Sequence, residues 1–123
     1  MATSEIVWYL LAAAVALFVT FRVWAFRRAV MGRVPPELAK RLVGEGATLV
    51  DVRTTREYQG GHLDGALNIP LHTLAGSLDR IPRGEPVVLY CLSGSRSARA
   101  ARLLRAADFT SVYDLGPMTA YPG

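Results

Sequence analysis

The chain contains a single cysteine, Cys91, whose neighbours are the residue types that chemistry on a thiol requires. Cys91 follows the apolar run 86–90, which predicts a buried strand, and a helical pattern begins at about Ser97. Small residues join the two segments. A thiol in such a turn lies among backbone N–H groups and faces a helix N-terminus, and both favour the thiolate and a bound anion. The pattern therefore predicts a nucleophilic cysteine together with the groups that activate it.

The loop after Cys91 has the composition of an anion-binding site. Gly94 lets the backbone curl so that successive N–H groups point inward, and Arg96 adds a fixed positive charge with planar donors. The simpler interpretation is that a lone free cysteine is a small buried core residue. We expect Cys91 to be catalytic and the segment behind it to bind substrate, namely Leu92, Ser93, Gly94, Ser95, Arg96 and Ser97.

Charged residues near the first predicted strand are candidates for supporting roles. Asp51 lies at the end of that strand, and we expect its carboxylate to accept hydrogen bonds from the cysteine loop. Arg53 and Glu57 are four residues apart, a spacing that favours an ion pair on a helical turn. No group of cysteine, histidine and carboxylate residues has the spacing of a metal site. We expect neither a metal nor an organic cofactor.

Strand patterns alternate with short helical patterns along the rest of the chain. Such alternation predicts an α/β fold whose parallel sheet is covered on both faces by helices. Sites in these sheets form at the carboxyl ends of the strands, where Asp51, Arg53 and Cys91 are all expected. The predicted strands are 47–52, 66–69, 86–90 and 111–115, and the predicted helical segments are 37–43, 54–58, 72–79 and 97–107.

An uncharged apolar run at residues 6–21 predicts one transmembrane helix. As a helix it is about 24 Å long, and extension to residue 26 gives about 31 Å, enough for the hydrocarbon core if Arg22 snorkels to the interface. Trp8, Tyr9 and Trp24 lie near the two ends, as interfacial aromatic residues do. A cleaved signal peptide is the alternative, but its charge would precede the apolar run. We therefore expect a membrane anchor at residues 6–26.

The distribution of charge gives the anchor an orientation. Residues 1–33 hold four arginines and one glutamate, and all four arginines follow the apolar run. By the positive-inside rule, the N-terminus is outside and the remainder is cytoplasmic, at the cell membrane. Residues 34–123 are nearly neutral, with ten basic and nine acidic side chains, which argues against a nucleic-acid partner. A lone cysteine also agrees with a reducing compartment.

A series of short motifs follows one another at residues 49–53, 57–58, 61–70, 87–91, in the loop with Gly94 and Arg96-Ser97, and at 98–109 and 112–116. With these motifs, residues 47–121 resemble a single-domain rhodanese. The resemblance implies a parallel α/β sheet and the transfer of sulfane sulfur. It implies that Cys91 takes sulfur from a small donor, thiosulfate or a persulfide, carries it as a persulfide, and passes it to a thiol or cyanide-like acceptor. The expected organisation is then an anchor with its basic flank at 1–30, a linker with a short helix at 31–46, and a rhodanese-like domain at 47–123.

The length of the cysteine loop separates this chain from related phosphatases. Four residues lie between Cys91 and Arg96, whereas tyrosine phosphatases have five, and the resemblance associates the shorter loop with sulfur substrates. Leu92 places an apolar side chain where thiosulfate-using relatives often have a polar one, so a persulfide donor competes with thiosulfate.

Two functions of different classes follow from these patterns. The first is a membrane-anchored sulfurtransferase with Cys91 as persulfide carrier. The second is a non-enzymatic rhodanese-like interaction or sulfur-relay module that docks a membrane protein or a sulfur-relay protein. The presence of both Cys91 and Arg96 favours the enzyme.

Overall fold

The computed structural model describes residues 2–30 and 32–123, with the backbone alone described for residues 25–30. The chain divides into two compact units, residues 1–31 and 32–123. The domain boundary expected at residue 31 falls on a position outside the described residues. The elements of the second unit are α2 (Pro36–Gly44), β1 (Thr48–Asp51), α3 (Thr55–Gln59), β2 (Leu67–Asn68), α4 (Leu71–Leu74), η1 (Leu78–Arg80), β3 (Val87–Cys91), α5 (Ser95–Ala106), β4 (Val112–Pro117) and η2 (Met118–Ala120).

The first unit is one long helix, α1 (Ala2–Val30), of 29 residues, which is about 43 Å long. Its segment Ala2–Trp24 is long and apolar enough to cross a membrane, and none of it is buried. Such a helix, apolar around its circumference and without protein cover, is suited to a lipid environment. A signal sequence near an N-terminus has the same length and composition. The predicted apolar helix is therefore present, and it could span a membrane.

The second unit is built on a parallel four-stranded sheet, as the sequence predicts. The strand order is β2-β1-β3-β4 and all neighbouring pairs are parallel. Val50 pairs with Leu67 on one side and with Leu89 on the other. Parallel pairing places the carboxyl ends of β1 and β3 at one edge of the sheet, and this edge holds Cys91.

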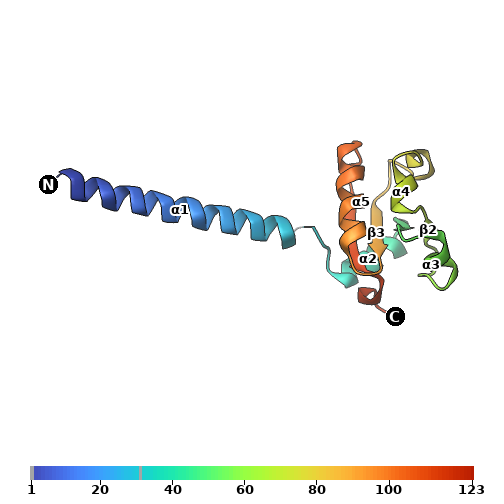
Figure 1. The fold of residues 1–123 in the computed structure, drawn as a ribbon. Helices are drawn as coiled ribbons and strands as arrows, with labels where there is room; N and C mark the ends of the chain where they lie inside the picture. Colours follow the sequence, from blue (N-terminus) through green and yellow to red (C-terminus); the bar gives the residue numbers. More distant parts are fainter. Residues whose placement is uncertain (1, 31) are drawn as a thin grey trace. The chain divides into compact units, whose positions relative to one another are not determined.

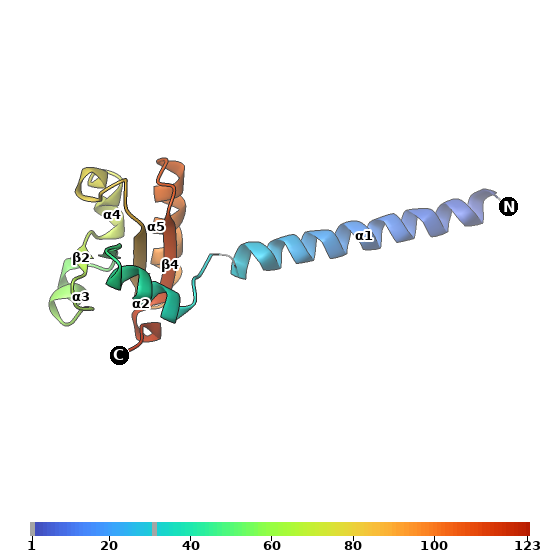
Figure 2. The same ribbon diagram turned by 180° about the vertical axis from the view of Figure 1, so that it is seen from behind.

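Helices cover both faces of the sheet, and a hydrophobic core lies on each face. Side chains of β3 alternate between these two cores. Val87, Leu89 and Cys91 face the core that contains residues of α5, while Val88 and Tyr90 face the core that contains residues of α2. All five residues of β3 are buried, as expected for a central parallel strand. Figure 1 shows α5 in front of β3, and Figure 2 shows α2 in front when the molecule is seen from behind.

Among the element boundaries that differ slightly from the prediction, one lies beside a glycine and one beside a proline. α5 begins at Ser95 rather than at Ser97, because Gly94 adopts a left-handed conformation (φ 102°) that turns the chain directly into the helix. β2 is only two residues long, since Pro70 cannot donate to a ladder.

A bridge on β4 joins the segment before α2 to the sheet edge. Arg33 pairs in parallel with Asp114, and the Val34 N–H donates to the Asp114 carbonyl at 2.9 Å. This backbone contact fixes Arg33 next to the carboxyl end of β4.

Candidate active site

The Cys91 sulfur lies at the centre of its loop and is fully buried. The Gly94 N–H donates to Sγ at 3.0 Å, and the Ser97 N–H lies 3.4 Å from the same atom. The thiol in turn donates to the Ser97 hydroxyl at 3.6 Å, and that hydroxyl donates to the Gly94 carbonyl at 3.1 Å. Two backbone donors at the start of α5 therefore point at the sulfur, which stabilises negative charge on it.

The other residues of the loop lie on its outer side. Leu92 is 52% exposed, and Ser93 and Ser95 are exposed with their hydroxyl oxygens 3.5 Å apart. Of the predicted loop residues, the structure thus brings Gly94 and Ser97 against the sulfur and turns Leu92, Ser93 and Ser95 outward.

Arg96 is bound to Glu57 on α3. Its two terminal nitrogens donate to the two carboxylate oxygens at 2.6 and 3.0 Å. Glu57 also accepts from the Thr54 N–H and hydroxyl, which completes the capping box that begins α3. The hydrogen bond from Arg96 lowers the pKa of Glu57 to about 2, and the same pairing raises the pKa of Arg96. Arg96 thus anchors the cysteine loop to α3.

Asp51 and Arg53 pair with each other instead of with the partners expected from the sequence. The Asp51 carboxylate accepts from the Arg53 backbone N–H at 2.8 Å and from its guanidinium at 2.7–3.1 Å. Arg53 also donates to the Gly61 carbonyl at 2.7 Å. Asp51 alternates with Val50 along β1, so its side chain points to the face of Tyr90, opposite to that of Cys91. The expected bonds from Asp51 to the cysteine loop, and from Arg53 to Glu57, are replaced by this buried pair.

Arg33 contacts the cysteine loop, and sequence reasoning missed this role. Its guanidinium lies so close to Gly94 and Gly116 that a Cβ built on either glycine would collide with it. Both glycines have positive φ, 102° and 86°. In the sequence, Arg33 is recognisable only as part of the basic flank. Its contacts with the loop depend on the backbone bridge to β4, which has no local sequence pattern.

A second missed residue is Asp114, which is buried on β4. Its carboxylate accepts from the Gly116 N–H at 2.9 Å. Burial raises the pKa of Asp114, while Ser97, the Gly116 N–H, Arg33 and Arg105 oppose that shift. Asp114 thus lies on β4 near Ser97 and Arg33, whose polar groups act on its carboxylate. Polar residues in the middle of an apolar strand pattern are the one signal that could have marked it.

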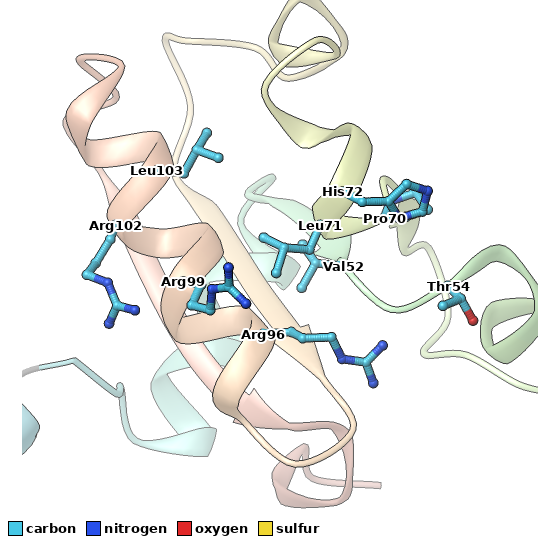
Figure 3. A pocket seen from close by; sticks show the side chains of 9 residues that line it. All are labelled: Val52, Thr54, Pro70, Leu71, His72, Arg96, Arg99, Arg102 and Leu103. Carbon is cyan, nitrogen blue, oxygen red and sulfur yellow. The ribbon is translucent and has the colours of Figure 1, made fainter.

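A cavity of about 540 Å³ lies beside the loop, between α4 and α5. Figure 3 shows Arg96 and Arg99 extending from α5 on the side of α4, with Leu71 and Val52 between the two helices. The lining residues are Val52, Thr54, Pro70, Leu71, His72, Arg96, Arg99, Arg102 and Leu103. Within residues 2–30 and 32–123, no group of three or more His, Cys, Asp or Glu side chains could hold a metal ion.

Comparison with known proteins identifies the class to which this fold and site belong. The rhodanese-like domain model matches residues 34–117. The uncharacterized protein YqhL of Bacillus subtilis is 46% identical over 69 residues, which are 56% of this chain and 55% of that protein. The thiosulfate sulfurtransferase GlpE of Pseudomonas savastanoi is 34% identical over 83 residues, covering 68% of this chain and 78% of the relative. The human single-domain sulfurtransferase TSTD1 has a similar structure (TM-score 0.56, 30% identity), covering 72% of this chain and 92% of that one.

The chain belongs to the rhodanese-like family, since the family model matches more than half of its length. Its enzyme class is accordingly that of the rhodanese-type sulfurtransferases. The matched region spans about half the length of the Bacillus subtilis relative.

Proposed function

We propose that this protein is a membrane-anchored sulfurtransferase that carries sulfane sulfur as a persulfide on Cys91. The observation that carries the proposal is the pair of N–H groups, from Gly94 and Ser97, directed at Sγ at 3.0 and 3.4 Å. These donors stabilise the attacking thiolate and the charge that returns to Sγ when the sulfur leaves. The S–H proton of Cys91 must leave before the first attack, and neither displacement then needs a proton on the sulfur.

The reaction consists of two displacements at sulfur. In the first, the Cys91 thiolate attacks the outer sulfur of the donor, a new S–S bond forms, and the donor's S–S bond breaks. Its electron pair leaves with sulfite or with a thiolate. In the second, an acceptor thiolate or cyanide attacks the outer sulfur, and the pair of the broken bond returns to Sγ. Covalent carriage thus divides one transfer into two simpler steps.

Both thiosulfate and a persulfide are proposed as donors. The name of the Pseudomonas relative, a thiosulfate sulfurtransferase, supports thiosulfate. Leu92 supports a persulfide, because an exposed apolar side chain beside the loop offers no charge to a small dianion but can contact an organic thiol.

Within the loop, we assign substrate contact to the outward surface of Leu92, Ser93 and Ser95, and charge stabilisation to Gly94 and Ser97. Arg96 contributes positive charge near the loop while it holds the loop to Glu57. Asp51 and Arg53 act indirectly as a buried pair behind Tyr90, since the Arg53 guanidinium lies 5.7 Å from the centre of that ring.

Anchoring at the cell membrane is the second part of the proposal. The segment Ala2–Trp24 of α1 supports a single pass, and the arginines after it support an outside N-terminus with the rhodanese-like domain in the cytoplasm. Cysteine variants test this orientation. In a Cys91→Ser background, a membrane-impermeant thiol probe on intact cells should label Thr3→Cys and should leave Glu85→Cys unlabelled until the cells are permeabilised. The reverse pattern contradicts the orientation.

A two-substrate kinetic experiment tests the enzymatic part. Thiosulfate and cyanide are varied together and thiocyanate is measured, with the full chain in detergent. Parallel reciprocal plots are expected, because the persulfide forms before the acceptor reacts. Cys91→Ser should abolish turnover, whereas Thr110→Ala, a change at an exposed residue outside the cysteine loop, should leave it unchanged. Absence of transfer from thiosulfate and from every persulfide tried would instead support a non-enzymatic module that docks a membrane or sulfur-relay protein.

A further inference from the structure

The two displacements at Cys91 do not require the cavity between α4 and α5. Its volume of about 540 Å³ is that of a site for a small organic ligand. Cys91 does not line it, and Arg96 is the one loop residue that does. The cavity therefore begins at the cysteine loop and continues along α5, away from the sulfur.

The residues that line this cavity carry positive charges that nearby acidic residues only partly neutralise. Arg96 is neutralised by Glu57, but in the described part of the chain Arg99 and Arg102 form no hydrogen bond or ion pair, and both are exposed. No acidic residue is among those that line the cavity. Arg105 is three residues further along α5 but donates to the Val112 carbonyl at 2.9 Å, on the other side of the helix. Arg99 and Arg102 are thus available to an anion from outside the chain.

The floor of the cavity is apolar. Val52 is buried, and Leu71 and Leu103 are partly buried. In an α-helix Arg99 and Arg102 lie about 4.5 and 9 Å along the axis from Arg96. A ligand that reaches from the loop to these arginines therefore needs an arm of at least that length, in contact with the apolar floor. Thiosulfate is too short to reach from the cysteine loop to Arg99 and Arg102.

We infer that this cavity binds the phosphate-bearing end of a low-molecular-mass persulfide donor, with its arm on Val52, Leu71 and Leu103. A phosphate monoester carries up to two negative charges and three acceptor oxygens, which match two guanidinium groups. The inference rests on the proposed function, because it names the substrate class of the same site. In the reaction, Cys91 attacks the outer sulfur, the donor's S–S bond breaks, and the phosphate-bearing thiolate leaves with the electron pair.

Two donors that differ only in the phosphate test the inference. The persulfides of 4′-phosphopantetheine and of pantetheine have the same arm, and the rate of sulfur uptake by the full chain is measured with each. We expect the phosphorylated donor to have the higher kcat/KM, by roughly tenfold, a factor typical of charge-assisted hydrogen bonds. Arg99→Gln/Arg102→Gln should remove this preference through KM and leave kcat and the pantetheine donor unchanged.

Arg41→Gln is the matched control, because Arg41 is an exposed arginine on α2, at the opposite face of the sheet. This variant should not change the rate of sulfur uptake with either donor. The inference is overturned if wild type shows no preference, or if the double variant slows both donors equally.

A binding experiment separates failure of this inference from failure of the proposed function. In Cys91→Ser, the thiol form of 4′-phosphopantetheine should bind, and Arg99→Gln/Arg102→Gln should weaken it, whether or not wild type transfers sulfur. If no donor is used but this binding holds, the proposed function fails and the anion site stands. If only vesicles that contain phosphatidylglycerol, and not the soluble ligand, respond to the two arginines, the site binds lipid headgroups and the inference is wrong.

Discussion

The guanidinium of Arg96 donates to both carboxylate oxygens of Glu57, at 2.6 and 3.0 Å, and so ties the cysteine loop to the first turn of α3. Glu57 serves two elements at once, because it also completes the capping box with Thr54. The position of the loop above β3 therefore depends on a short helix from a different part of the sheet edge.

Glu57→Gln should slow sulfur uptake by Cys91 with little loss of stability. Glutamine still reaches the Thr54 N–H, and the partly exposed ion pair that it replaces contributes less than about 1 kcal/mol. Uptake rates measured by mass spectrometry should fall severalfold while the free energy of unfolding stays nearly constant. Glu57→Ala, which also removes the capping box, should lose roughly a further 1 kcal/mol. Equal uptake in wild type and Glu57→Gln would show that the pairing does not position the loop.

The same pair sets a pH dependence. Pairing with Arg96 lowers the pKa of Glu57 from 4.5 to about 2 in the folded protein. A lowered folded pKa means that the stabilisation is present above the unfolded value and is lost as pH falls from about 4.5 toward 2. Carboxyl-carbon NMR should give a Glu57 midpoint near 2, and Arg96→Ala should move it up toward 4.5. A midpoint that is the same in both proteins would contradict the pairing.

Gly94→Ala should destabilise the domain and displace the N–H that faces Cys91. Alanine at positive φ costs about 1–2 kcal/mol, and its Cβ also collides with the Arg33 guanidinium. In the Gly94→Ala background, Arg33→Ala should restore the part of the unfolding free energy that the collision removes, but not the part that the strained backbone removes. Urea unfolding of the two single variants and the double variant gives the coupling energy. Strictly additive effects would show that Arg33 does not cover the loop.

Removal of one member of the Asp51–Arg53 pair should be strongly destabilising. The two side chains are 5% and 0% exposed, and Asp51→Asn leaves the Arg53 charge buried without its counter-ion, at about 3–5 kcal/mol. Thermal unfolding measures the loss. Asp64→Asn, the same substitution at an exposed aspartate, is the control and should have little effect. Similar stability of the two variants would contradict the structural role given to the pair.

Local patterns were sufficient to predict the sheet and the place of Cys91. Three adjacent segments carry the information: the apolar run before Cys91, the small residues after it, and the helical period beyond Ser97. Because they are neighbours in sequence, the strand, the turn and the helix can be predicted from local composition. The same holds for the apolar helix at the N-terminus. The predicted helix 97–107 differs from α5 by two residues at its start, where the left-handed Gly94 lets the helix begin earlier, and by one residue at its end.

The contacts around the sulfur could be predicted only in part, because several join distant segments. Asp51 is predicted near the loop from its place at a strand end, but its side chain points to the other face of the sheet, which depends on strand register. The covering of Gly94 and Gly116 by Arg33 requires the bridge to β4. The pairing of Glu57 with Arg96 requires α3 and α5 to meet. None of these relationships has a signature within one segment.

Carriage of sulfur on Cys91 is tested most directly by intact-mass spectrometry of the full chain after exposure to thiosulfate or a persulfide. We predict a gain of one sulfur atom that maps to the peptide with Cys91, disappears on addition of cyanide, and is absent in Cys91→Ser. Absence of that gain with every donor, or its persistence in Cys91→Ser, would contradict the account.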